Sequence, residues 1–418
     1  MQNQGMLKTL FTLKGNQRAC LWTEPLWGIP FVLYEPFAAL YMAALGLSLE
    51  QIGFVTSFSL IIQIFASVLS GVLTDKLGRR KCTMLTDLFA WTTPMLIWTF
   101  ADGFNWFLVA ALFNGLQRVS ITSWNLLMVE ECEPDLIVKC FSLTQFAGLL
   151  AVFFAPLSML GVERFGLVPA MRVIYGIGFV LMTTKAFLLY ACSKETQIGL
   201  TRMEETRGRS ISQLLLECVD VITGLLKDKR VLLALGTLAA FQAIKDVKRI
   251  FWGLYLVNNL GVKEEYLALF LMLRSIGTLV GIMIIVPRLR YAKFKRPMLV
   301  SWGMFLAAEA VLLTGTTGVG GLVVATVSAL LEAFALSVLV PMTDSLLVIN
   351  TEERERARIL GLVYAFMLLP ASIFPALAGW LASFTLAAPL VLTMALVVVG
   401  AALTVWLSRQ RGEESVAG

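Results

Sequence analysis

The sequence predicts an all-α integral membrane protein with twelve transmembrane helices in two pseudo-symmetric six-helix bundles. Composition, the spacing of apolar runs and the distribution of positive charge predict this fold class. Of 418 residues, 58% are hydrophobic and 15% charged, and the mean hydropathy is +0.80. A soluble domain carries about 25% charged residues. The net charge of +6 indicates no nucleic-acid partner, because the basic residues lie in short turns between apolar runs.

The apolar runs have the length that a lipid bilayer requires, about 20 residues for one spanning helix. Twelve runs qualify, covering residues 20–45, 51–73, 82–101, 106–130, 138–160, 170–191, 231–257, 265–287, 298–315, 321–348, 358–380 and 387–407.

The long polar segment 192–230 separates the sixth run from the seventh. We therefore expect an N-terminal bundle over 1–191, a linker over 192–230 and a C-terminal bundle over 231–418. Apolar residues at helical spacing predict an amphipathic helix on the membrane surface within the linker: Ile211, Leu214, Leu215, Val219 and Ile222.

Positive charge predicts the orientation of the chain. Most of the 34 Lys and Arg residues fall in alternate turns and in both terminal tails, whereas Arg164, Arg172 and Lys263 fall on the other side. Cytoplasmic loops carry the excess of Lys and Arg. We therefore expect a multi-pass protein of the plasma (cytoplasmic) membrane with both termini in the cytoplasm.

A weak internal similarity supports two related halves. Residues Asn125–Val129, followed by Glu131–Pro134, are similar to Ser345–Ile349, followed by Thr351–Arg354. Each stretch lies at the end of the fourth run of its half, as a duplicated architecture requires.

The turn between the second and third runs reads Gly-Val-Leu-Thr-Asp-Lys-Leu-Gly-Arg-Arg-Lys over residues 71–81. With twelve runs, cytoplasmic ends and a long central segment, this signature makes the whole chain resemble the major facilitator superfamily (MFS). The resemblance implies the MFS fold and a secondary transporter that works by alternating access. It also implies a cytoplasmic gate comprising Gly71, Asp75, Gly78, Arg79, Arg80, Glu130 and Glu131.

Within that gate, the resemblance implies two contacts. Asp75 would hold the halves together near the N-terminal end of the eleventh helix, where a carboxylate is favoured by the helix dipole. Arg79 would pair with an acid at the inner end of the fourth helix, either Glu130 or Glu131.

Charged residues inside the runs predict where solute binds, because a charge at bilayer depth needs a cavity or a partner. We expect an excess of cations in a central cavity, with two tryptophans beside them. The predicted substrate-binding residues are Arg118, Lys245, Lys248, Arg249, Arg274, Trp124 and Trp252.

The spacing of Lys245, Lys248 and Arg249 predicts that they project from one side of the seventh helix. Lys185 is near the end of the sixth run, so we expect its ammonium to reach the headgroups.

Acids inside the runs are the candidates for proton coupling, because the chain contains no histidine. The predicted proton-coupling residues are Glu35, Glu332 and Asp246. Asp87 and Glu309 are interpreted as structural. Glu24 is either a gate residue or a partner for a basic residue of the N-terminal tail.

These patterns favour a proton-coupled carrier of a small organic anion or zwitterion, with protons or another ion as the coupling partner. Two alternatives stay open: a multidrug/proton antiporter that exports amphipathic compounds, and a non-transporting sensor or scaffold. The sequence has no nucleophile–base pattern, metal-ligand cluster or phosphate-binding loop. We therefore predict no enzyme activity, no metal and no cofactor, and a monomer in the lipid bilayer.

Overall fold

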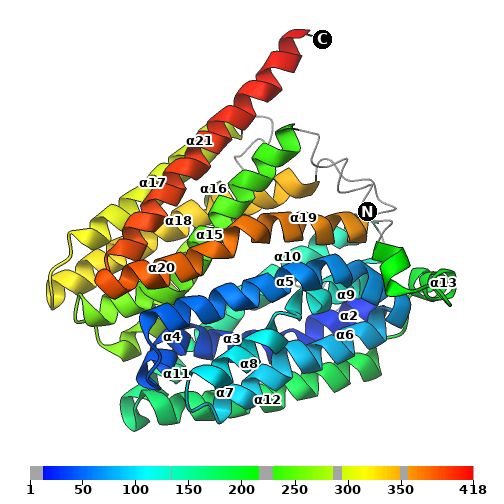
Figure 1. Cartoon of the computed structure of the whole chain (residues 1–418), viewed down its shortest axis with the longest axis horizontal. Coiled ribbons are helices and arrows are strands. Elements are labelled where there is room, and N and C mark those ends of the chain that lie inside the picture. The colour runs from blue at the N-terminus through cyan, green and yellow to red at the C-terminus, as the bar shows by residue number, and fades with distance from the viewer. Residues whose placement is uncertain (1–12, 133, 216–228, 286–293, 349–355, 418) are drawn as a thin grey trace.

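The computed structural model describes residues 13–132, 134–215, 229–285, 294–348 and 356–417, which contain helices and no strand. Most helices run side by side along the longest dimension of the molecule (Figure 1). The predicted all-α class is confirmed, and each predicted apolar run falls on helix. Nine of the described helices qualify as membrane spans by length and composition alone. The remaining runs lie on helices within 79–99, 104–129 and 229–258, which is consistent with twelve spans.

The N-terminal half contains several bent runs, each built from consecutive short helices. Their bounds are α2 (Gly15–Thr23), α3 (Pro25–Tyr34), η1 (Glu35–Phe37), α4 (Ala38–Ala44), α5 (Leu49–Leu77), α6 (Arg79–Asp87), η2 (Leu88–Thr92), α7 (Thr93–Thr99), α8 (Phe104–Asn114), α9 (Gln117–Val129), α10 (Pro134–Ala151), η3 (Val152–Phe154), α11 (Ala155–Phe165) and α12 (Leu167–Cys192).

Prolines and one π-helical turn account for bends that matter below. Pro25 begins α3 directly after Glu24, and Pro36 follows Glu35 in the η1 turn. Proline cannot donate a backbone hydrogen bond inside a helix, so the chain bends beside each acid. The η2 segment is π-helical and directly follows Asp87. Such turns occur frequently at functional sites.

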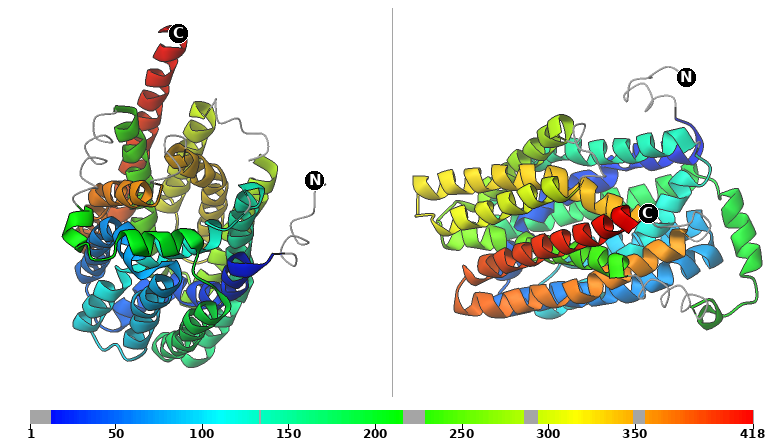
Figure 2. Two further views of the ribbon diagram at one scale, coloured as in Figure 1. Left: turned by 90° about the vertical axis from the view of Figure 1, so that its right-hand side faces the viewer. Right: turned by 90° about the horizontal axis from the view of Figure 1, so that it is seen from above.

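The C-terminal half is built from longer, more continuous helices. Their bounds are α15 (Lys229–Asn258), η4 (Glu264–Tyr266), α16 (Leu267–Ile285), α17 (Lys295–Leu313), α18 (Val319–Val348), α19 (Arg356–Ala371), α20 (Ile373–Phe384) and α21 (Ala388–Ala417). In the left view of Figure 2, the yellow to red helices lie above the blue and cyan helices. The last turns of α21 project beyond the other helices (Figure 1).

The linker contains α13 (Gln197–Glu205), which lies at the same end of the molecule as the turn between α5 and α6 (Figure 1). We call this end the signature end. Of the predicted amphipathic helix, residues 211–215 are helical, whereas Val219 and Ile222 lie outside the described residues. Residues 349–355 of the predicted internal similarity also lie outside them.

The two halves also pack closely at the opposite end. There α5 contacts α20 backbone to backbone: a β-carbon added at Gly53 would lie 2.3 Å from the carbonyl oxygen of Pro375, and one at Gly379 would lie 2.7 Å from that of Leu49. The Ala376 amide donates a hydrogen bond of 2.9 Å to Ser57 Oγ. Only glycine permits so close an approach of α5 and α20.

Candidate functional site

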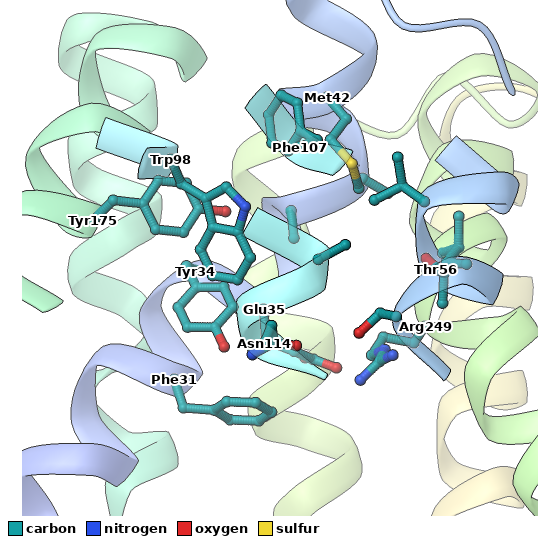
Figure 3. Close-up of a pocket in the computed structure, with 16 residues that line it drawn as sticks. Phe31, Tyr34, Glu35, Met42, Thr56, Trp98, Phe107, Asn114, Tyr175 and Arg249 are labelled. Carbon is teal, nitrogen blue, oxygen red and sulfur yellow. The ribbon is translucent and has the colours of Figure 1, made fainter. Parts of the chain in front are cut away.

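A cavity of about 130 Å3 lies between α15 and the helices of the N-terminal half. Aromatic side chains form one wall, and a small set of polar groups lies across from it (Figure 3). The aromatic residues are Phe31, Tyr34, Trp98, Phe107 and Tyr175. The polar residues are Glu35, Thr56, Ser59, Asn114 and Arg249. Mostly apolar walls with a few convergent polar groups are typical of small-molecule sites.

The aromatic wall is held by ring contacts between α3, α7 and α12. Tyr34 lies 5.4 Å from Tyr175 and 5.9 Å from Trp98, measured between ring centroids. Trp98 lies 5.3 Å from Tyr175, and the Tyr41 hydroxyl donates a hydrogen bond of 2.8 Å to the Trp98 carbonyl. These contacts fix the rings before any solute enters.

Arg249 is the cation of this cavity. Its Nη2 lies 3.2 Å from Asp246 Oδ1, and its side chain is still 45% exposed. Asp246 also accepts a hydrogen bond of 2.8 Å from Gln242. One carboxylate therefore orients the guanidinium, and the rest of its donors face the cavity.

Glu35 is the cavity's acid, and it comes from the other half of the chain. Within the described part of the structure, its carboxylate has no ion pair and no side-chain hydrogen bond. The η1 bend at Pro36 turns this side chain toward the cavity, near Asn114 and across from Arg249 (Figure 3). Asn114 is itself held by a 3.0 Å hydrogen bond to the Ala90 carbonyl.

A second, smaller cavity of about 30 Å3 lies on the other side of Glu35 and Arg249. Its further lining includes Lys248, Trp252 and Arg274. Glu35 and Arg249 therefore line both cavities, and each residue comes from a different half of the chain.

A tight ion cluster borders the second cavity, and we call it the balanced cluster: Lys248, Arg274, Glu309 and Glu332. Lys248 pairs with Glu309 and, at 2.8 Å, with Glu332. Arg274 pairs with Glu332 at 3.2 Å. Two cations thus meet two carboxylates, and three of the four side chains are almost completely buried.

The three cations of the seventh run have different surroundings, contrary to the sequence prediction. Lys248 turns inward to the balanced cluster, whereas Lys245 and Arg249 are exposed. The Lys245 ammonium lies 5.0 Å from the Phe241 ring, and it lines neither cavity. Successive side chains of a helix point about 100° apart, so Lys248 and Arg249 diverge even though they are adjacent.

Arg118 is held without a carboxylate among the described residues. Its Nε donates a 3.0 Å hydrogen bond to Gln63, and its guanidinium lies 4.9 Å from the Tyr364 ring of the other half. Arg118 lines neither cavity, and its guanidinium joins the two halves at Tyr364.

A second ion cluster lies in the N-terminal half, and we call it the triad: Glu24, Asp87 and Lys185. Lys185 Nζ lies 3.8 Å from Glu24 and 3.6 Å from Asp87. The expectation that Lys185 reaches the headgroups is wrong, because its side chain is buried between these two acids. Trp124 lies here too, with its ring 6.0 Å from Lys185 Nζ, and not in either cavity.

The signature turn is a dense set of hydrogen bonds. Arg79 pairs with Asp75 at 3.1 Å and with Glu130 at 2.8 Å. Glu195 accepts the backbone amides of Arg79 and Arg80 at 2.9 and 3.0 Å, so a linker carboxylate lies at the N-terminus of α6.

The other gate residues complete this turn. Glu131 accepts the amide of Gln197 at 3.1 Å and makes no contact with Arg79, so Glu130 is the partner of that arginine. Gly78 has a φ of +80°, which glycine adopts readily. Gly71 is buried within α5, which packs along α19.

Sequence reasoning missed Trp98, Phe107, Tyr175 and Asn114 of the cavity. Asn114 offered a usable signal, because it is an amide that directly follows the uninterrupted apolar stretch 106–113. The aromatic residues offered none, since rings in apolar runs usually pack against other helices.

The fold and site define a multi-pass helical membrane protein with a polar, partly aromatic cavity between two halves. The model of the Major Facilitator Superfamily matches residues 28–251, more than half of the chain. The chain belongs to this superfamily. No curated protein sequence matches the chain.

Solved structures with the same fold are transporters of differing solutes. The nucleoside transporter NupG has a TM-score of 0.71 at 14% identity, with 94% of this chain and 99% of that chain covered. A bacterial homolog of the human lysosomal transporter Spinster, inward-facing and unoccupied, has a TM-score of 0.68 at 14% identity and 98% coverage of both chains. The human organic anion transporter MFSD10 (TETRAN) has a TM-score of 0.62 at 14% identity, covering 93% and 98%.

Proposed function

We propose that this protein is a proton-coupled secondary transporter that moves a small organic zwitterion or anion by alternating access. The halves 1–191 and 231–418 would move relative to each other about the cavity, joined by the linker 192–230. The observation that carries the proposal is that Glu35 and Arg249, from opposite halves, line the same two cavities.

A zwitterion suits this pair of charges. Its carboxylate would bind the Arg249 guanidinium, which offers several planar donors, and its ammonium would bind Glu35. A solute bound in this way contacts both halves, so its binding stabilises their approach. The aromatic wall would accommodate the solute's organic part.

The cavity volume bears on the drug-export alternative. The volume of the cavity that Arg249 and Glu35 line, about 130 Å3, is well below the roughly 300–1,000 Å3 typical of drug-sized ligand sites. A small solute therefore fits this site better than a bulky amphipathic compound does.

Coupling requires a carboxylate that changes its protonation. Of the three acids predicted for this task, Asp246 pairs with Arg249 and Glu332 pairs with two cations. Glu35 is the remaining acid, and it faces the cavity. A proton on Glu35 would compete with a substrate ammonium, which links the two.

The membrane orientation is part of the same proposal. The signature end carries the basic turn Gly71–Lys81, so it would face the cytoplasm. Cys192 is exposed near this end. In a variant with Cys132 and Cys218 replaced by serine, a membrane-impermeant maleimide should label Cys192 in inside-out but not right-side-out vesicles, and adding Cys192→Ser gives the unlabelled control.

The binding site is tested in two steps. A thermal-shift screen of purified protein against amino acids, small organic acids, phosphates and cationic drugs identifies compounds that stabilise the fold. Uptake of a stabilising compound is then measured in proteoliposomes with and without a proton gradient. Arg249→Gln and Glu35→Gln should each lower uptake at least about tenfold, as loss of one charged hydrogen bond predicts.

The matched control is Lys245→Gln, which removes a cation one helical turn from Arg249 but outside both cavities. Its uptake should stay near wild type. Stabilisation by cationic drugs alone, with unchanged uptake in Arg249→Gln, would replace this proposal with drug export.

A further inference from the structure

The triad of Glu24, Asp87 and Lys185 has two acids for one base. Their side chains are buried, with exposed fractions of 9%, 3% and 6% for the three residues. With every group ionised, the triad would carry one uncompensated negative charge inside a membrane protein. An unpaired buried charge is costly, and such groups usually become neutral instead.

The contacts of the triad are loose where those of the balanced cluster are tight. Lys185 approaches the acids only to 3.8 and 3.6 Å, beyond hydrogen-bond distance. Among the described residues, Glu24 Oε2 and Asp87 Oδ2 are buried without a hydrogen-bond partner, as are Glu309 Oε2 and Glu332 Oε2 of the balanced cluster, although Lys248 lies 2.8 Å from Glu332 Oε2. Ser120 donates to the other oxygen of Asp87. Each acid thus keeps one buried oxygen that lacks a proton donor.

Neighbouring helices carry cations, but in the described part of the structure these have other partners: Arg79 pairs with Asp75 and Glu130, and Arg118 donates to Gln63. Cys20 of α2 is the additional titratable group whose charge would act on the triad, and Cys140 of α10 lies beside it. A thiol cannot neutralise a carboxylate. Ser120 and Trp124 of α9 complete the surroundings and are uncharged.

We propose that the triad is a proton-binding site that holds one proton on Glu24 or Asp87, separate from the substrate cavity. With one acid protonated, Lys185 pairs with the carboxylate of the other. The added proton also gives the protonated acid a hydrogen-bond donor, which its buried oxygen otherwise lacks. The site lies at bent or irregular backbone: Glu24 joins α2 to α3, and Asp87 precedes the π-helical turn η2. Movement of these joints would expose the site to water and release the proton.

The role of this proton in driving transport rests on the proposed function, but its presence does not. Infrared difference spectra of purified protein, recorded from mildly acidic to alkaline pH, report the carbonyl band of protonated carboxyl groups without any substrate. We expect the wild-type protein to lose one such band as the pH rises.

Two independent single substitutions test the assignment. Glu24→Gln and Asp87→Asn each leave a neutral acid–lysine pair, so each should abolish that band while the fold survives. Lys185→Met should enlarge it, because two acids then need two protons. Glu205→Gln, at an exposed linker pair with Arg202, is the matched control and should leave the band unchanged.

An unchanged band in both Glu24→Gln and Asp87→Asn, or its absence from the wild-type protein, would overturn the proposal. Proteoliposome uptake is measured separately. If the two variants lose the band but uptake does not depend on a proton gradient, the proton site is supported and its role in coupling is excluded. The failure of the site and of the transport mechanism are therefore distinguishable.

Discussion

The two buried ion clusters place a lysine between two acids in each half of the chain, and they differ in charge balance. In the C-terminal half, Arg274 adds a second cation, and the contacts are short. In the N-terminal half, Lys185 stands alone between Glu24 and Asp87 at longer range. A balanced, tight cluster stays ionised and fixes helix packing, whereas a cluster with one surplus acid holds a proton.

The largest expected effect is on the balanced cluster. Glu332→Gln removes the carboxylate that both Lys248 and Arg274 contact, so it leaves an uncompensated buried charge. Breaking a buried pair in this way costs about 3–5 kcal/mol. The melting temperature of the purified protein should fall clearly.

Glu205→Gln is the control for that substitution, because its pair with Arg202 is largely exposed. Exposed pairs contribute about 1 kcal/mol or less. Equal melting temperatures for the two variants would show that the balanced cluster does not stabilise the fold.

A second substitution should convert the balanced cluster into a proton site. Lys248→Met leaves Arg274 with Glu309 and Glu332, the same surplus of one acid that the triad has. The folded variant should then bind one proton that the unfolded chain releases at neutral pH, so its stability should fall as the pH rises, by up to about 1.4 kcal/mol per pH unit. Melting temperatures measured across pH test this.

Lys245→Met is the matched control on the same helix, since Lys245 lies outside the cluster. Its pH dependence should follow the wild-type protein. If Lys248→Met did so too, charge balance would not explain the difference between the halves.

Arg118 sharpens the comparison because no described carboxylate pairs with it. Arg118→Gln breaks one hydrogen bond and one ring contact, and it leaves no buried charge behind. We expect a stability change of about 1–2 kcal/mol, together with a strong loss of uptake of the identified solute. Tyr364→Leu removes the ring contact and keeps the cation, so it should retain uptake; equal loss in both variants would make Arg118 a packing residue.

The smallest expected effect is at Trp124. Its buried indole nitrogen has no hydrogen-bond partner among the described residues, so Trp124→Phe should change the melting temperature little. Its ring lies against Lys185, however, and should respond to the charge of the triad. The pH-dependent part of the intrinsic fluorescence should therefore disappear in Trp124→Phe; its persistence would place the responding tryptophan elsewhere.

The fold was largely predictable from the sequence, because hydropathy and the placement of Lys and Arg are local properties of each segment. The signature turn also narrowed the partner of Arg79 to Glu130 or Glu131, and the structure pairs Arg79 with Glu130. The sequence could not predict which acids pair with Lys185 and Lys248. That choice depends on the rotation of each helix about its axis, and a rotation of about 100° exchanges one residue's surroundings for the next.

The substrate cavity was only partly predictable for the same reason. Arg249 and Glu35 were expected near it, but Lys248 and Arg274 are neutralised by Glu309 and Glu332, two acids from different helices. The aromatic wall is formed by rings from α3, α7, α8 and α12, which lie far apart in the sequence. Pairwise contacts between distant helices therefore decide which charges face solute.

The central claim, that the N-terminal half stores a proton which the C-terminal half does not, is tested most directly by counting protons. Potentiometric titration of purified wild-type protein and of Glu24→Gln, from neutral to alkaline pH, gives the number of protons that each releases while folded. The wild-type protein should release one proton more per chain than Glu24→Gln. Equal numbers for the two proteins would contradict it.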